Sequence, residues 1–167
     1  MLTNEKIRTF LSKALFGESE LYKQYIIPLQ GNWYNPVDDN GKAATWVGFH
    51  IIHISGEVRP IMVGNQIDTF CECLLHLQFI GPQALECAQS VLNWNMRSDI
   101  SKMLLDMFGG HLLCDKRRIK SSPYNQDGMN NTLLYALEIK FIFNNQEKPE
   151  MPILTGAELS GNLIIGG

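Results

Sequence analysis

The chain has 167 residues, of which 45% are hydrophobic and only 19% are charged, and this length is typical of a single domain. Its formal net charge of −3 at pH 7 argues against a protein that binds nucleic-acid phosphates over a broad basic face. No signal peptide is recognisable, and no apolar run approaches the roughly eighteen residues of a membrane span, so we expect a soluble, cytosolic protein without a membrane partner. The low share of charged residues favours a protein that covers part of its surface with a partner.

The first expected element is an amphipathic helix over residues 3–16, capped by Thr3 and closed by Gly17. Its apolar residues recur at helical spacing: Ile7, Phe10, Leu11, Ala14 and Leu15. Residues 21–29 are expected to form a short, irregular or extended segment, and Pro28 excludes a central strand because proline has no N–H to donate. Residues 31–44 are rich in Gly, Asn, Asp and Pro, which indicates a loop or the tip of a hairpin.

A strand is predicted over residues 45–54, where both parities are apolar apart from His50 and His53. Such a strand is covered on both sides, either within the fold or by a neighbouring subunit. Strict alternation places the two histidines on opposite faces, so we expect each to have its own partner or to lie at an edge.

The stretch 70–108 predicts a strand, a tight turn and two helices. One parity of the strand 70–80 is wholly apolar (Cys71, Cys73, Leu75, Leu77 and Phe79), whereas the other includes Glu72, His76 and Gln78. Gly81-Pro82 ends the strand, and a helix over 82–96 is expected to pack on it through Ala84, Leu85, Ala88, Val91, Leu92 and Met96. A second helix, capped by Ser98 or Asp99, carries Ile100, Met103, Leu104 and Met107 and stops at Gly109-Gly110.

Four cysteines, at positions 71, 73, 87 and 114, raise the alternatives of disulfides or of a metal site with His76 or His111. Cys71 and Cys73 share the apolar parity of their strand, whereas His76 has the opposite parity, so these three cannot bind one ion without a bulge. We therefore expect buried, reduced thiols and no metal ion.

Residues 111–119 predict a short strand followed by a turn-rich stretch, and residues 132–143 predict the clearest strand of the chain. In the latter, one parity is apolar (Leu133, Tyr135, Leu137, Ile139, Phe141 and Phe143), and the other includes Thr132, Glu138 and Lys140. The chain's basic cluster is Lys116, Arg117, Arg118 and Lys120. A solvated surface is the favoured interpretation of this cluster, and contact with phosphate or an acidic partner is the alternative.

These elements predict an α/β (α+β) fold: one domain over residues 1–148, with a mostly antiparallel or mixed sheet flanked by two or three helices. Residues 149–167 contain two prolines and four glycines and cannot supply a core of their own. They nevertheless carry apolar residues, among them Ile153, Leu154, Leu163, Ile164 and Ile165. We therefore expect an extended C-terminal arm that contacts another subunit.

No sequence motif for catalysis or for a cofactor is present. The chain lacks a nucleophile elbow, a P-loop, a dinucleotide fingerprint, a zinc-protease helix motif and a calcium loop. The acidic residues are scattered; Glu138 and Lys140 are spaced as neighbours on a strand face and not as groups acting on one substrate atom. We expect a protein that is not an enzyme and that needs no cofactor.

One segment resembles a known family. Residues 75–100, LHLQFIGPQALECAQSVLNWNMRSDI, are similar to the strand–turn–helix segment of phage tail terminator and neck (head–tail joining) proteins. That segment reads as a strand ending in an aromatic residue and glycine, an alanine-rich helix and an R-x-D step. The matching positions here are Phe79, Gly81, Ala84, Ala88, Arg97 and Asp99.

The resemblance implies a structural virion protein without catalytic residues, assembled in the host cytoplasm as a homo-oligomeric ring, usually sixfold, in the viral tail or neck. Such a ring terminates the tail tube and joins it to the head connector, and genomic DNA passes through its lumen without specific binding. On that interpretation the polar parity of the two long strands lines the lumen: Glu72, His76, Gln78, Glu138 and Lys140.

The alternative is a small nucleic-acid-binding module. It would use the basic cluster within residues 116–120 together with Trp33, Tyr34 and Trp46, because basic and aromatic side chains together bind single strands. Against it, the chain is acidic overall, and the aromatic residues lie in a different stretch from the charges.

Overall fold

In the computed structural model of the chain, the residues described are 2–17, 25–30, 37, 39–55, 61–63, 66–113, 118–124 and 132–147. Their elements are, in chain order, α1 (Asn4–Phe16), β1 (Ile26–Pro28), β2 (Trp46–Ser55), β3 (Ile61–Val63), β4 (Gln66–Ile80), α2 (Ala84–Leu92), the 3-10 helix η2 (Trp94–Met96), α3 (Ser98–Phe108), β5 (His111–Leu112), β6 (Lys120–Tyr124) and β7 (Thr132–Glu147). The predicted arm over residues 149–167 lies outside these ranges, as do Trp33, Tyr34, Cys114, Lys116 and Arg117.

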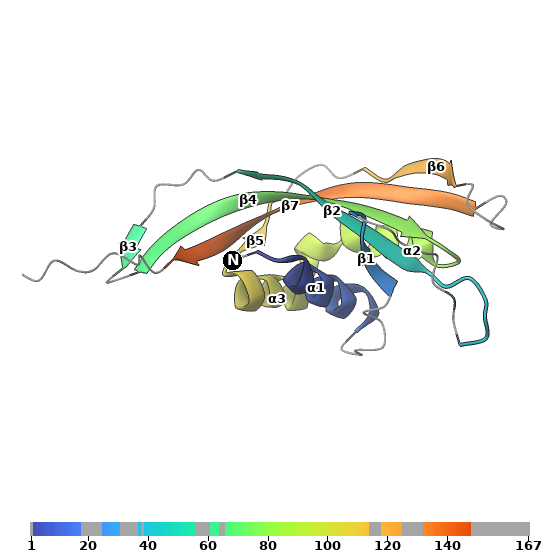
Figure 1. Cartoon of the computed structure of the whole chain (residues 1–167), viewed down its shortest axis with the longest axis horizontal. Helices are drawn as coiled ribbons and strands as arrows, with labels where there is room; N and C mark the ends of the chain where they lie inside the picture. The colour runs from blue at the N-terminus through green and yellow to red at the C-terminus, as the bar shows by residue number, and fades with distance from the viewer. Residues whose placement is uncertain are drawn as a thin grey trace, which may run out of the picture.

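The strands form one mixed sheet with the order β1-β2-β4-β7-β5, in which β3 also pairs with β4 and β6 with β7. β1 is parallel to β2, and the other pairings are antiparallel. The sheet arches over the helices, which lie together on one of its sides (Figure 1). The predicted α+β domain, with a mixed sheet flanked by three helices, is therefore confirmed.

The side of the sheet that faces the helices carries the core. The apolar parities of β4 and β7 lie there as predicted, and most of their side chains are buried: Cys71, Cys73, Leu75, Leu77, Phe79, Leu137, Ile139, Phe141 and Phe143. At the start of β7, Leu133 is 45% exposed and Tyr135 is half-buried. Helix α1 adds Ile7, Phe10, Leu11 and Ala14, and α3 adds Ile100, Leu104 and Phe108. Each element therefore stabilises the others by removing its apolar face from water.

The turn between β4 and α2 requires glycine. Gly81 has φ 115°, and a Cβ at this position would lie 2.6 Å from the Ala44 carbonyl oxygen. The Thr45 hydroxyl accepts a hydrogen bond of 2.8 Å from the Gln83 N–H and so fixes the start of α2 to the chain just before β2. The strand–turn–helix predicted from Gly81-Pro82 is thus confirmed, with a close backbone approach as its cause.

Helix α2 is shorter than predicted, and this changes its packing. It ends at Leu92, and the 3-10 helix η2 follows from Trp94 to Met96. Ala84, Ala88 and Val91 are buried as expected, but Leu85, Leu92 and Met96 are exposed, Met96 to 92%. Trp94 is fully buried in their place and contacts the Phe10 ring edge-on at 5.5 Å.

The first half of β2 is covered on both sides and the second half is not. Trp46, Val47 and Phe49 are buried, whereas Ile52 and Ile54 are 46% and 44% exposed. The described part of the fold therefore does not cover the second half of this strand, and its coverage by a neighbouring subunit stays a prediction.

The two prolines found in strands both lie in edge strands of the described sheet. Proline is confined to such positions because it has no N–H to donate to a neighbouring strand. Pro28 ends β1, which agrees with its exclusion from a central position. Pro123 lies in β6, which pairs with β7 over residues 120–124. The sequence predicted turns for this stretch, and that prediction is wrong for residues 120–124. β6 has no apolar alternation that would indicate a strand, and it forms one because it pairs with β7. None of the helices in the described ranges combines the length and apolar character needed to cross a membrane.

Candidate functional site

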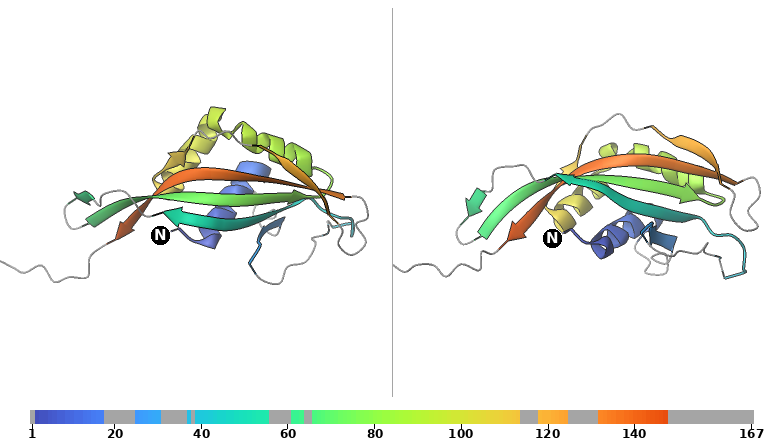
Figure 2. Two further views of the ribbon diagram at one scale, coloured as in Figure 1. Left: turned by 90° about the horizontal axis from the view of Figure 1, so that it is seen from above. Right: turned by 45° about the horizontal axis from the view of Figure 1, so that its top comes forward.

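The side of the sheet opposite the helices carries the polar residues singled out in the sequence. We call this side the open face, because in the described structure no helix lies in front of β2, β4 and β7 when the sheet is seen from above (Figure 2). The half-buried side chains on it include Glu72, His76, Gln78 and Lys140, and Glu138 is exposed. All five predicted residues therefore lie on one surface.

Strand pairing arranges these residues in rows across the sheet. His76 of β4 lies opposite His50 of β2 and opposite Glu138 of β7. The neighbouring row brings Leu74 opposite Lys140. Side chains directly opposite on one face of an antiparallel pair are close enough to interact.

The open face carries an ion pair and a histidine–carboxylate contact. Lys140 Nζ lies 3.6 Å from Glu72 Oε1, and His76 Nδ1 lies 3.8 Å from Glu138 Oε1. Gln78 Nε2 is 3.2 Å from His76 Nε2. These pairs are partly exposed, so each contributes little to stability, but together they leave no strong field of one sign on the surface.

His50 was not among the predicted site residues, and the structure adds it. Its Nδ1 lies 3.1 Å from Gln30 Nε2, which agrees with the expectation that it has a partner of its own. A β-bulge between Ile51 and His53 shifts the register, so that His53 pairs with Leu74, whose parity is that of His76. The opposite-face assignment assumed unbroken alternation, and a bulge has no signature in the apolar pattern of this strand.

Burial sets the ionisation of the open face's central histidine. Partial burial lowers the pKa of His76 below its ordinary value of 6.5, and the positive charges of His50 and Lys120 act in the same direction. The Glu138 carboxylate opposes them by raising the pKa. His76 is therefore held mainly neutral at pH 7.

We expect Glu138→Gln to lower the pKa of His76 further, because this change removes the carboxylate that favours the imidazolium. Lys120→Gln should raise it. The unfolded chain binds the His76 proton more readily than the folded one, so this histidine's contribution to stability is complete above pH 6.5 and is lost as the pH falls below that value. NMR titration of the imidazole C–H signals measures the pKa values; equal values in both variants and the wild type would contradict this arrangement.

Cys71 and Cys73 are buried thiols, as expected, whereas Cys87 is only half-buried. Burial raises the pKa of Cys73 to about 12 and that of Cys87 to about 11, the latter with a contribution from Glu86. Both are protonated at neutral pH and are therefore poor nucleophiles and poor metal ligands. Within the described ranges, no group of three His, Cys, Asp or Glu side chains is placed to hold a metal ion.

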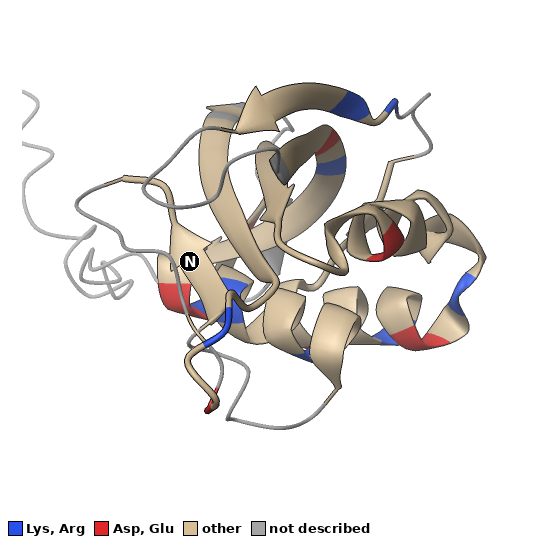
Figure 3. Ribbon diagram, turned by 90° about the vertical axis from the view of Figure 1, so that its right-hand side faces the viewer, with Lys and Arg blue, Asp and Glu red and all other residues tan. Residues whose placement is uncertain are grey.

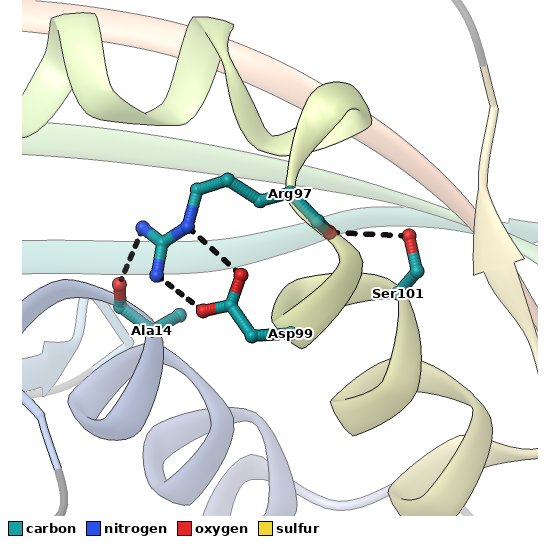
Figure 4. Close-up of polar contacts among 4 residues, drawn as sticks. All are labelled: Ala14, Arg97, Asp99 and Ser101. Atoms are coloured by element: carbon teal, nitrogen blue, oxygen red, sulfur yellow. Dashed lines mark hydrogen bonds and ion pairs between the residues drawn. The ribbon is translucent and has the colours of Figure 1, made fainter.

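The R-x-D step joins two helices. The Arg97 guanidinium donates two hydrogen bonds to the Asp99 carboxylate and a third, of 3.5 Å, to the Ala14 carbonyl near the end of α1 (Figure 4). This arrangement raises the pKa of Arg97 and lowers that of Asp99 from its ordinary 3.8, mainly through their hydrogen bonds. The predicted N-caps Ser98 and Asp99 both lie inside α3, and Arg97 occupies the N-cap position, so that prediction is wrong.

Of the residues of the alternative, nucleic-acid interpretation, the structure describes Trp46, Arg118 and Lys120. Trp46 is fully buried and contacts the Tyr124 ring at 6.5 Å, so it cannot stack on a base. Arg118 and Lys120 are exposed. Lys and Arg positions alternate with Asp and Glu positions over the described elements in the view of Figure 3 and form no continuous basic face.

No protein-family model matches the sequence, and a comparison with curated proteins gave no match.

Proposed function

We propose that this chain is a structural virion protein of a tailed phage that forms a homo-oligomeric ring, usually sixfold in the family it resembles, at the head–tail junction. The ring ends the tail tube and joins it to the head connector, and the genome passes through its lumen. The observation that carries the proposal is the open face, a sheet surface on which Glu72, His76, Gln78, Glu138 and Lys140 lie together and which none of the described helices covers.

The pairing of charges on this face suits a channel for DNA. A lumen with a strong positive potential would bind phosphates and retain the passing duplex, because each neutralised phosphate releases counterions. On the open face, Lys140 is paired with Glu72, and His76 is neutral at pH 7 beside Glu138. Such a surface is hydrated but does not bind DNA phosphates strongly.

The segment that carries the family resemblance also has a consistent physical role. Phe79 and Ala88 are buried between sheet and helix, Gly81 makes the close turn, and Arg97 with Asp99 ties α3 to α1. These residues fix the protomer's shape, which a ring requires of every copy. All of these residues stabilise the fold, and none of them suggests a catalytic role, which is consistent with a structural protein.

Light scattering coupled to size-exclusion chromatography tests the proposal. We expect a species of roughly six times the 18.9 kDa chain mass whose size is unchanged by nuclease, and negative-stain images should show a ring with a central hole. A monomer at all concentrations that shifts to larger size only with an oligonucleotide would overturn the proposal in favour of a nucleic-acid-binding module.

Reversing the open-face acids should make the lumen adhesive. The double variant Glu72→Lys and Glu138→Lys is expected to fold, because both side chains are substantially exposed, and to retain more duplex DNA at low salt. The excess retention should disappear as salt is raised. DNA retention is measured by co-sedimentation with the assembled ring.

A matched control separates position from total charge. Glu5→Lys with Glu86→Lys changes the net charge equally but on α1 and α2, away from the open face. Equal DNA retention by the two double variants, or no increase in either, would show that the open face does not line the channel.

A further inference from the structure

A cavity of about 300 Å³ lies where the start of α1, the end of α3 and the end of β7 meet, and nothing in the ring proposal uses it. Its lining comes from all three elements: Leu2 and Lys6, then residues 105–109, then Phe143, Asn144 and Gln146. We call it the α1/α3/β7 cavity. Figure 1 shows the N-terminus, α3 and the end of β7 gathered at this end of the molecule.

The lining combines polar and apolar residues. Phe108 and Phe143 belong to it and are almost fully buried. Lys6, Asp106 and Gln146 are exposed, and Leu105 is 61% exposed. A site that takes up aliphatic side chains together with the backbone that carries them needs this combination.

One polar atom in the lining lacks a partner. The Asn144 side-chain oxygen is buried, and no described group donates a hydrogen bond to it. A buried acceptor without a donor is unfavourable, so turning this amide toward the cavity, where a backbone N–H of a bound segment can donate to it, would be stabilising.

The sequence outside the described residues contains a segment of matching chemistry. β7 ends at Glu147, directly after the cavity residue Gln146, and twenty residues, 148–167, follow. They include the apolar groups Ile153-Leu154 and Leu163-Ile164-Ile165, separated by glycines. Their acidic residues, Glu150 and Glu158, are complementary to Lys6 at the mouth of the cavity.

We propose that the α1/α3/β7 cavity is the receptor for the C-terminal segment of a neighbouring copy, with an Ile or Leu side chain against the exposed Leu105. The inference rests on the proposed ring, and it names the surface that receives the arm. A neighbour is the expected source because a ring places copies side by side.

Disulfide trapping in the full-length protein tests the receptor. In the pair Leu105→Cys with Leu154→Cys, mild oxidation by diamide should link copies into covalent multimers on non-reducing gels. A second pair, Asp106→Cys with Ile164→Cys, probes the other apolar group. It also keeps the test possible if the first double variant does not fold. The docked pair should give roughly tenfold or more interchain product than a control, because docking raises the effective thiol concentration.

The control pair is Leu133→Cys with Leu154→Cys, since Leu133 is 45% exposed at the opposite end of β7. Variants with only one of the two new cysteines show how much product comes from disulfides to the native cysteines. Rings without interchain product from either pair, or product only within one chain, would overturn the receptor and leave the ring proposal standing. Interchain product in a protein that forms only dimers would support the receptor and contradict the ring.

Discussion

Leu77→Ala should lower the free energy of unfolding by about 2–5 kcal/mol, the range found for truncating a fully buried leucine. Leu77 has no exposed surface and lies in the middle of β4, opposite Phe49 on β2 and Leu137 on β7. Both neighbours are buried beneath the helices as well. Removing the side chain would therefore leave a cavity that the two flanking strands, fixed by their pairing, can close only in part.

Urea denaturation of the dilute protein measures this loss. Leu133→Ala is the matched control, because Leu133 is a leucine on the same sheet with 45% of its surface exposed, and its loss should cost less than about 1 kcal/mol. Equal costs for the two variants would show that the β4 apolar parity is not the centre of the core.

The two long strands were predictable because their alternation is complete. From Cys71 to Phe79 every odd position is apolar and buried, and the same holds from Leu137 to Phe143. A period of two specifies both the strand and the face that it buries. The five open-face residues follow from the same alternation, so their common surface could be inferred before their pairing was known.

Helix packing was less predictable, since a periodic apolar stripe does not say where a helix ends. Leu85 and Leu92 fit the stripe of α2, yet both are exposed, and Met96 lies beyond the end of the helix. The chain turns through η2 after Leu92 and places Trp94 against Phe10. A contact between residues this far apart in sequence leaves no local periodic signal.

Strand pairing was not predictable at two places. The bulge in β2 between Ile51 and His53 breaks the alternation and sets His53 opposite Leu74. β6, with the sequence KSSPY, has a loop-like composition and is a strand because β7 offers it a free edge. In both cases a neighbouring strand decides the local conformation, and tertiary context outweighs propensity.

Deleting residues 150–167 should leave the thermal melt of the dilute monomer nearly unchanged while it strongly weakens ring formation. The core residues that the structure describes lie between Ile7 and Phe143, and we expect the protomer's packing not to need the deleted segment. Burial of a single Ile or Leu side chain contributes roughly 1.5–3 kcal/mol, which is about a ten- to hundredfold change in an association constant. Each ring interface would lose at least one such anchor.

The melt is recorded below the assembly concentration, because binding between copies would otherwise raise the apparent stability of the full-length protein alone. Light scattering over a concentration series then measures assembly. A full-length variant with Ser at positions 153, 154 and 163–165 keeps the length and charge of the arm and should assemble as poorly as the truncated chain, since the apolar side chains supply the docking free energy. A truncated monomer that melts several degrees earlier yet still forms rings would place the arm in the protomer's own core instead, and the anchors would then stabilise folding and not association.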